Sequence, residues 1–145
     1  MEPDQLFARA LALLAARPLS RYELSNKLTE IAEREQVEEV LERISEFGYL
    51  NDRRLAETFL ATHPGYGPAK LRRHLAGRGI SPEIISALMS EYDPFKAGVR
   101  LLESHSWSHQ GHEDKAVRYL LRKGFSLTQA RNCYLYWNKN QNHDF

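Results

Sequence analysis

A short pattern that ends one helix and begins the next occurs twice, and it constrains the fold more than any other feature. Arg78-Gly79-Ile80-Ser81 returns 45 positions later as Lys123-Gly124-Phe125-Ser126. Each copy follows one apolar helical pattern and precedes another. Glycine can adopt the left-handed conformation that ends a helix, and a serine hydroxyl can cap the helix that follows. Two such helix pairs at this spacing are typical of a helical repeat protein.

The N-terminal third follows the same plan without the glycine. Ser20 and Glu23 form a capping-box pattern for a helix that reaches Leu28. A second helix is expected from about Gln36 to Phe47. The linker at residues 31–36, IAEREQ, contains no glycine.

A further helix precedes each of the three pairs. These helices are expected at residues 4–17, 52–63 and 93–104, and Asp52 and Asp93 are the expected N-caps of the last two. Nine helices and no convincing strand predict an all-α fold of three tandem three-helix repeats. The expected repeats are residues 1–50, 51–92 and 93–145, the last with a polar C-terminal tail.

Apolar residues at helical spacing predict the core. Three stripes carry it: Val37, Val40, Leu41, Ile44 and Phe47; Ile84, Ile85, Leu88, Met89 and Tyr92; and Leu127, Ala130, Cys133, Tyr134 and Trp137. Since Cys133 is the only cysteine, the chain has no intrachain disulfide, and we expect this residue to be buried. No apolar run is long enough to cross a bilayer, so we expect a cytoplasmic protein without a membrane partner.

Charge is distributed unevenly, although the net charge of the whole chain is only +1. Residues 1–50 carry six Lys or Arg against ten Asp or Glu, a net charge of −4. Residues 51–92 carry six against four, or +2, and residues 93–145 carry eight against five, or +3. This polarity predicts an anionic partner for the two later repeats, although solvated helix faces are an equally simple interpretation.

The basic residues concentrate on equivalent helices of the second and third repeats. Lys115, Arg118 and Arg122 fall within an arc of about 60° on one helix. The candidate binding residues are Lys70, Arg72, Arg73, Arg78, Lys115, Arg118, Arg122 and Lys123. No acidic residue lies between Glu57 and Glu83 to offset the first four. Phosphate is the first expected ligand and an acidic protein surface the second.

Catalytic and metal-binding patterns are weak in this sequence. No phosphate-binding loop, dinucleotide fingerprint or nucleophile elbow occurs, so we expect neither an enzyme nor a cofactor. His105, His109 and His112 have a spacing that could align them on a helix, but the serines and the glycine among them indicate a loop rather than a metal site.

Two other classes of binding protein fit parts of the pattern. Gln129, Arg131 and Asn132 could read base edges from a recognition helix, which makes a sequence-specific DNA-binding protein of the helix-turn-helix type the alternative interpretation. A general helical adaptor for an acidic protein is a third.

The whole pattern resembles the RecX family of recombination regulators. The resemblance depends most on Phe47-Gly48-Tyr49-Leu50-Asn51-Asp52 and on the Gly79-Ile80 and Gly124-Phe125 turns, with Ser20, Glu23, Leu24, Leu28, Leu55, Ala56, Gly67, Leu71, Leu75 and Leu120 as further matches. It implies a curved, elongated solenoid of three-helix units. We expect the chain to be a monomer. It also implies that the partner is the RecA recombinase filament, whose growth and activity such proteins inhibit in DNA recombination, DNA repair and the SOS response. Weak, non-specific binding to single-stranded and double-stranded DNA is a further expectation, although an acidic first repeat is unusual for this family.

Overall fold

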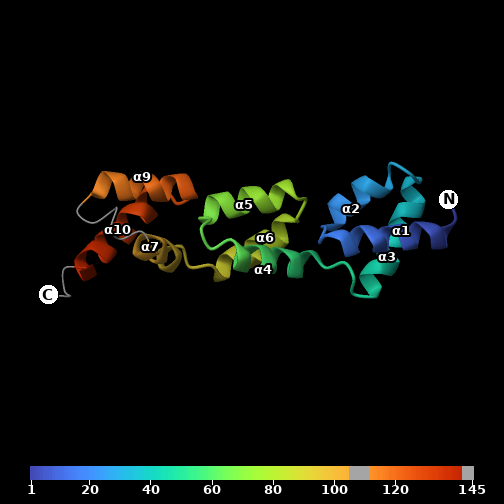
Figure 1. Cartoon of the computed structure of the whole chain (residues 1–145), viewed down its shortest axis with the longest axis horizontal. Coiled ribbons are helices and arrows are strands. Elements are labelled where there is room, and N and C mark those ends of the chain that lie inside the picture. Colours follow the sequence, from blue (N-terminus) through green and yellow to red (C-terminus); the bar gives the residue numbers. More distant parts are fainter. Residues whose placement is uncertain (105–111, 142–145) are drawn as a thin grey trace. The chain divides into compact units, whose positions relative to one another are not determined.

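The computed structural model describes residues 1–104 and 112–141, and within these ranges the chain is all helical. The helices, labelled as in Figure 1, are α1 (Pro3–Ala16), α2 (Arg21–Leu28), α3 (Arg34–Glu46), α4 (Asp52–Thr62), α5 (Pro68–Gly77), α6 (Pro82–Glu91), α7 (Pro94–Ser104), α9 (Glu113–Lys123) and α10 (Leu127–Gln141). This order confirms the all-α class and the three-helix repeat. None of the described helices is both long and apolar enough to span a membrane.

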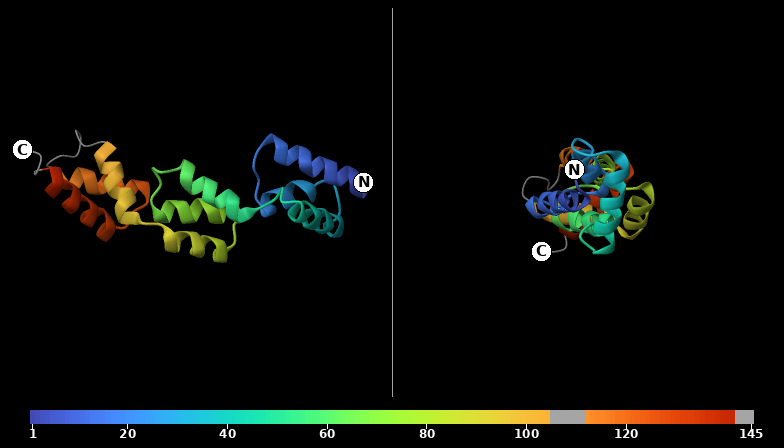
Figure 2. Two further views of the ribbon diagram at one scale, coloured as in Figure 1. Left: turned by 90° about the horizontal axis from the view of Figure 1, so that it is seen from below. Right: turned by 90° about the vertical axis from the view of Figure 1, so that its right-hand side faces the viewer.

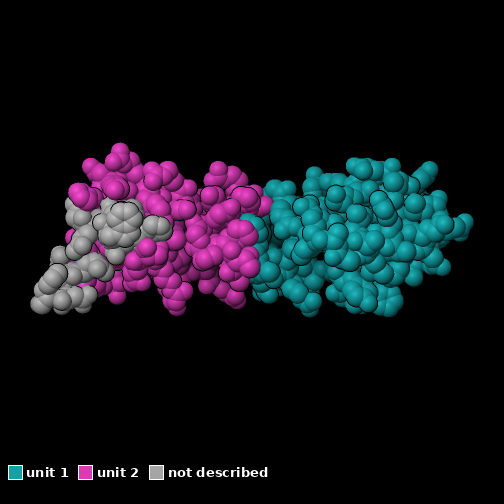
Figure 3. Space-filling view, viewed as in Figure 1, with its two compact units in different colours: residues 1–59, 75–87 teal, residues 60–74, 88–145 magenta. Residues whose placement is uncertain are grey.

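The chain divides into two compact units, which Figure 3 colours separately. Unit 1 contains Met1–Phe59 and Leu75–Ala87, and unit 2 contains Leu60–His74 and Leu88–Phe145. Helices α4, α5 and α6 therefore contribute residues to both units. The repeat boundaries at 1–50, 51–92 and 93–145 stay a prediction, because the division into units follows different boundaries.

Each unit has its own apolar core. In unit 1, α1, α2 and α3 pack together, as Figures 1 and 2 show, around Leu6, Leu24, Leu41 and Ile44, all fully buried. In unit 2, α10 packs against α7 and α9. The residues at the centre of that core are Leu102, Leu120, Ala130, Cys133 and Trp137. The burial of Cys133 confirms that part of the sequence analysis.

The ends of the predicted stripes depart from the expectation of burial. Phe47 is 64% exposed and Leu127 is 49% exposed, although both continue an apolar stripe. Phe47 follows the last residue of α3, where it packs against the Phe7 ring at a centroid distance of 5.9 Å instead of entering the core. Leu127 is the first residue of α10. The helical stripes are thus buried along their length and exposed where the helix meets a turn.

The turns after α3, α5 and α9 share one hydrogen-bond pattern. Gly48, Gly79 and Gly124 have φ of +81°, +81° and +103°, the left-handed region that favours glycine. In each turn the amide of the residue after the glycine donates to a carbonyl of the last helical turn, as from Ile80 N to Leu75 O and from Phe125 N to Leu120 O, both 3.1 Å. The left-handed turns predicted at Gly79 and Gly124 are confirmed, and Gly48 adds a third.

The helix starts show which capping predictions hold. The Ser20 hydroxyl accepts from Glu23 N at 3.1 Å while the Glu23 carboxylate accepts from Ser20 N at 2.9 Å, so the capping box is present. Asp93 caps α7 by accepting from Lys96 N at 3.1 Å. The prediction for Asp52 was wrong, because Asn51 caps α4 instead. Asp52 accepts from the backbone N–H of Arg21 at 2.9 Å.

Candidate functional site

The start of α5 lies directly against the end of α9 within unit 2. Gly67 N donates to Lys123 O, and Ala69 N donates to Gly124 O at 3.0 Å. A Cβ on Gly124 would lie 2.8 Å from both Cβ and N of Lys70, so only glycine permits this approach. The last carbonyls of a helix have no partner within that helix, and here the amides at the start of α5 supply one. The contact places the cations of both helices in one compact unit.

Five of the eight candidate residues are exposed cations. They are Arg72, Arg73, Lys115, Arg118 and Arg122. None of them forms an ion pair with any residue that the structure describes. Arg118 Nε donates to the backbone carbonyl of Asp114 within α9 at 3.3 Å. Their positive charge is therefore directed to solvent rather than to neighbouring carboxylates.

The charges along α9 follow the helix dipole. Glu113 and Asp114 lie in its first turn, and Arg122 and Lys123 lie in its last turn. Carboxylates near the N-terminus and cations near the C-terminus are both stabilised by the aligned peptide dipoles. The charge order along α9 thus favours folding, and it places Arg122 and Lys123 at the end that meets α5.

Lys70 and Lys123 are partly buried and contact tyrosine rings. Lys70 Nζ lies 4.3 Å from the centre of the Tyr66 ring, and Lys123 Nζ lies 5.5 Å from that of Tyr119. Burial raises the pKa of Tyr119, and the Arg122 charge opposes that shift. An aromatic ring attracts a cation without neutralising it, so both lysines still add to the positive potential.

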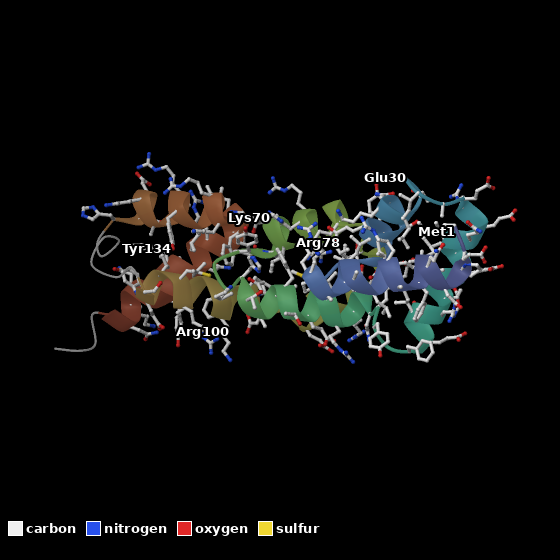
Figure 4. All side chains as sticks on the ribbon, turned by 45° about the vertical axis from the view of Figure 1, so that its right-hand side comes forward. Met1, Glu30, Lys70, Arg78, Arg100 and Tyr134 are labelled. Atoms are coloured by element: carbon white, nitrogen blue, oxygen red, sulfur yellow. The ribbon has the colours of Figure 1, made fainter. Side chains whose placement is uncertain are left out.

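Arg78 differs from the other candidates because it forms an ion pair with Glu23 inside unit 1. Its guanidinium Nη2 lies 2.8 Å from Glu23 Oε1, and the side chains of Arg78 and Glu23 are only 26% and 22% exposed. Arg78 Nη2 also donates to Pro18 O at 3.1 Å, and the Ser20 hydroxyl donates to Arg78 O. Lys70 and Arg78, labelled in Figure 4, thus have different environments at the two ends of α5. We leave Arg78 out of the candidate surface, because a carboxylate distant in sequence already compensates it.

One of the three residues proposed for a recognition helix, Gln129, takes part in the cap of α10. The Gln129 side chain accepts from Ser126 N at 2.9 Å, and Ser126 Oγ accepts from Gln129 N at 3.1 Å. Gln129 therefore closes the cap of α10, and its carboxamide oxygen is engaged there. Arg131 and Asn132 are exposed.

The histidine segment lies mostly outside the described residues. His105 and His109 lie outside the described residues, so the interpretation of the segment as a loop stays a prediction. His112 is exposed and immediately precedes α9.

The sequence analysis did not predict that Lys70 and Lys123 contact tyrosine rings. Tyr119 and Lys123 are four positions apart on α9, a spacing that places side chains on the same face of a helix. Tyr66 precedes the first turn of α5 and reaches Lys70 because the chain turns at Gly67. The first contact could have been predicted from its spacing, whereas the second depends on the turn.

These helices and their exposed cations define an all-helical repeat protein with a cationic surface on unit 2. The family model described as the second three-helix domain of RecX matches residues 51–89. The regulatory protein RecX of Thermus thermophilus is 35% identical over 132 residues, which cover 90% of this chain and 91% of that protein. That of Stenotrophomonas maltophilia is 33% identical over 137 residues, which cover 88% and 84%. The chain belongs to the RecX family of regulatory proteins.

Solved structures agree with this fold. The crystal structure of RecX from Lactobacillus salivarius matches with a TM-score of 0.80 at 23% identity, covering 94% of this chain and 97% of that one. A second crystal structure of a regulatory protein RecX matches with a TM-score of 0.72 at 21% identity, covering 94% and 71%. At this level of identity the likeness supports the fold rather than the activity.

Proposed function

We propose that this protein binds filaments of the RecA recombinase on single-stranded DNA and inhibits their growth and activity in recombination and DNA repair. Membership of the RecX family supports the regulatory role. The observation that carries the binding mode is the set of five exposed cations, Arg72, Arg73, Lys115, Arg118 and Arg122, without an ion-pair partner among the described residues.

The proposed mechanism is electrostatic and steric. Cations that approach a phosphate backbone release condensed counterions, which favours binding at low salt. The cations of α5 and α9 contact the anionic groove of the filament, and the bulk of the helical array blocks the addition of recombinase subunits. Arg78 takes no part, since Glu23 already binds it.

The acidic first repeat has a different role in this proposal, namely contact with recombinase protein rather than with DNA. Its helix α3 carries Glu39 and Glu46 on the exposed side, where like charge would repel phosphate. Part of the acidity is compensated within unit 1, because Arg21 contacts Glu38 and Glu42 at 3.3 and 3.1 Å.

Charge reversal tests the proposal. The double variant Arg118→Glu/Arg122→Glu should lose most of its inhibition of RecA ATPase activity on single-stranded DNA, while its helicity and melting temperature stay close to those of the wild type. Arg53→Glu/Arg54→Glu is the control with the same change of charge, because both arginines are exposed on α4 in unit 1 and lie outside the acidic first repeat. Full inhibition by the double variant would remove α9 from the interface. No inhibition by the wild-type chain would refute the function itself.

A further inference from the structure

The outward face of α10 has an unusual composition. Six exposed residues recur there at helical spacing: Thr128, Arg131, Asn132, Leu135, Tyr136 and Lys139. Leu135 and Tyr136 are 58% and 50% exposed, and α10 contains no Asp or Glu. Solvated helix faces usually mix both signs of charge and expose few large apolar groups. Cations interleaved with exposed apolar groups indicate a binding surface.

An aromatic pair lies at the edge of this face. The rings of Phe95 and Tyr136 meet at a centroid distance of 5.1 Å and an interplanar angle of 70°, and Phe95 is 40% exposed. The backbone at Phe95 is held by the core, since the buried Cys133 of α10 donates through Sγ to the Phe95 carbonyl at 3.5 Å. Pro94 and the Asp93 cap fix the start of α7 directly beside Phe95. Both rings are therefore preorganised and still accessible.

A shallow cavity of about 340 Å³ adjoins the two rings. Lys96 and Arg100, one turn apart on α7, line it and are exposed without an ion pair to any described residue. Figure 4 labels Arg100 on α7. Asp93 and Glu103 also line the cavity. The Asp93 carboxylate accepts a hydrogen bond from the backbone N–H of Lys96, so it is engaged in the cap of α7.

We propose that Phe95 and Tyr136 form a stacking platform for the unpaired bases of single-stranded nucleic acid, with Lys96, Arg100, Arg131 and Lys139 contacting the flanking phosphates. Every base has a π-face, so aromatic side chains between cations bind single strands with little sequence preference. Bases inside a duplex are already stacked and cannot reach the platform. The inference deepens the proposed function by naming residues that contact the strand, but binding at this site requires no recombinase.

The test compares two labelled oligonucleotides of the same length, one of thymidine and one with abasic sites, in an anisotropy titration without RecA. Their phosphate charges are equal, so a difference in affinity reports the bases. Stacking contributes about 1–3 kcal/mol per base, so the wild type should bind the thymidine strand about tenfold more tightly or better. Phe95→Leu/Tyr136→Leu should lose most of this preference and retain its affinity for the abasic strand.

Three further variants separate stacking from other effects. Tyr136→Phe keeps the ring and should keep the preference, whereas Arg131→Ala/Lys139→Ala should weaken binding to both strands alike. Phe47→Leu/Tyr49→Leu removes another exposed aromatic pair, in unit 1, and should leave the preference unchanged.

Equal affinity of the wild type for both strands would overturn the platform. So would an unchanged preference in Phe95→Leu/Tyr136→Leu, which would indicate that the bases contact another part of the protein. Neither result bears on inhibition of RecA ATPase activity, so failure of this inference is distinguishable from failure of the proposed function.

Discussion

The Arg78 guanidinium contacts the Glu23 carboxylate at 2.8 Å, across 55 positions of sequence. It joins the turn after α5 to the first turn of α2 inside unit 1. The Ser20 hydroxyl strengthens this contact by accepting from Glu23 N and donating to Arg78 O. A residue that the sequence places among uncompensated cations therefore stabilises the packing of one repeat on the next.

The ion pair predicts an acid-sensitive contribution to stability. Burial by itself would raise the pKa of Glu23, but hydrogen bonds from Arg78 and Ser20 and the Arg78 charge hold it below its ordinary value of 4.5. The unfolded chain then binds more protons than the folded chain in the window below pH 4.5. The contribution is fully present above that window and is lost as the pH falls through the folded-state pKa.

Glu23→Gln should thus lower the free energy of unfolding by about 1–3 kcal/mol at neutral pH, with a smaller difference from the wild type under acid conditions. Urea unfolding across this pH range measures the effect. Glu39→Gln is the control, because Glu39 is exposed on α3 and forms no ion pair with any described residue. A difference between wild type and Glu23→Gln that does not vary with pH would contradict the assignment.

Two of the turn glycines, Gly48 and Gly79, predict different losses of stability when each is replaced by alanine. Gly48→Ala places a Cβ in open space at φ +81°, so it should cost only the strain of the left-handed backbone, about 1 kcal/mol. Gly79→Ala has the same φ but brings its Cβ to 2.3 Å from Cβ and Cγ of Tyr22. It should cost about 1–3 kcal/mol more. Denaturant unfolding gives the order, and equal losses would show that Tyr22 moves aside freely.

The exposed cations of α9 predict a salt dependence. Each phosphate contact on a single strand contributes about 0.7 to the slope of log K against log salt concentration. Replacing Lys115, Arg118 and Arg122 together by Ala should therefore reduce the magnitude of that slope by about 2. Affinity for a single-stranded oligonucleotide, measured over a series of salt concentrations, checks the change. A parallel loss of affinity with an unchanged slope would indicate that these residues do not contact phosphate.

Cys133 predicts an unreactive thiol. Burial, with a further contribution from the Asp93 charge, raises its pKa from 9.0 to about 11. The thiolate is the reactive form, so at neutral pH its fraction should fall by about 100-fold relative to an ordinary thiol. Labelling with a thiol reagent should be slow in buffer and fast in denaturant. Similar rates in both would mean that the core around α10 opens readily.

How well the sequence predicts an interaction depends on how far apart the two partners lie along the chain. Gly79, Gly124, Ser20 and Asp93 were predicted correctly, because turns and caps are decided by residues within a few positions of each other. Asn51 replaced Asp52 as the cap of α4, an error of one position. Among the candidate binding residues, the predicted exposure is confirmed for Arg72, Arg73, Lys115, Arg118 and Arg122.

The missing glycine of the first repeat also has a structural reason. Gly79 and Gly124 each lie against the start of a helix in the preceding repeat, where a Cβ would meet Tyr22 or Lys70. The turn between α2 and α3 closes instead with Thr29 in a right-handed conformation, and Ile31 stays 43% exposed. The sequence revealed the difference between the turns, but only the packing explains it.

The sequence by itself determined the helices, their turns and the sign of the charge on each repeat, because these follow from the conformational preferences of single residues and from helical periodicity. The tertiary structure alone decided which charges remain available: it paired Arg78 with Glu23, placed Lys70 and Lys123 over tyrosine rings, and left Phe95 beside Tyr136 at the surface. Each of these contacts joins groups whose proximity depends on how helices pack. Electrostatic and aromatic interactions act over a few ångströms of space, whatever the separation along the chain.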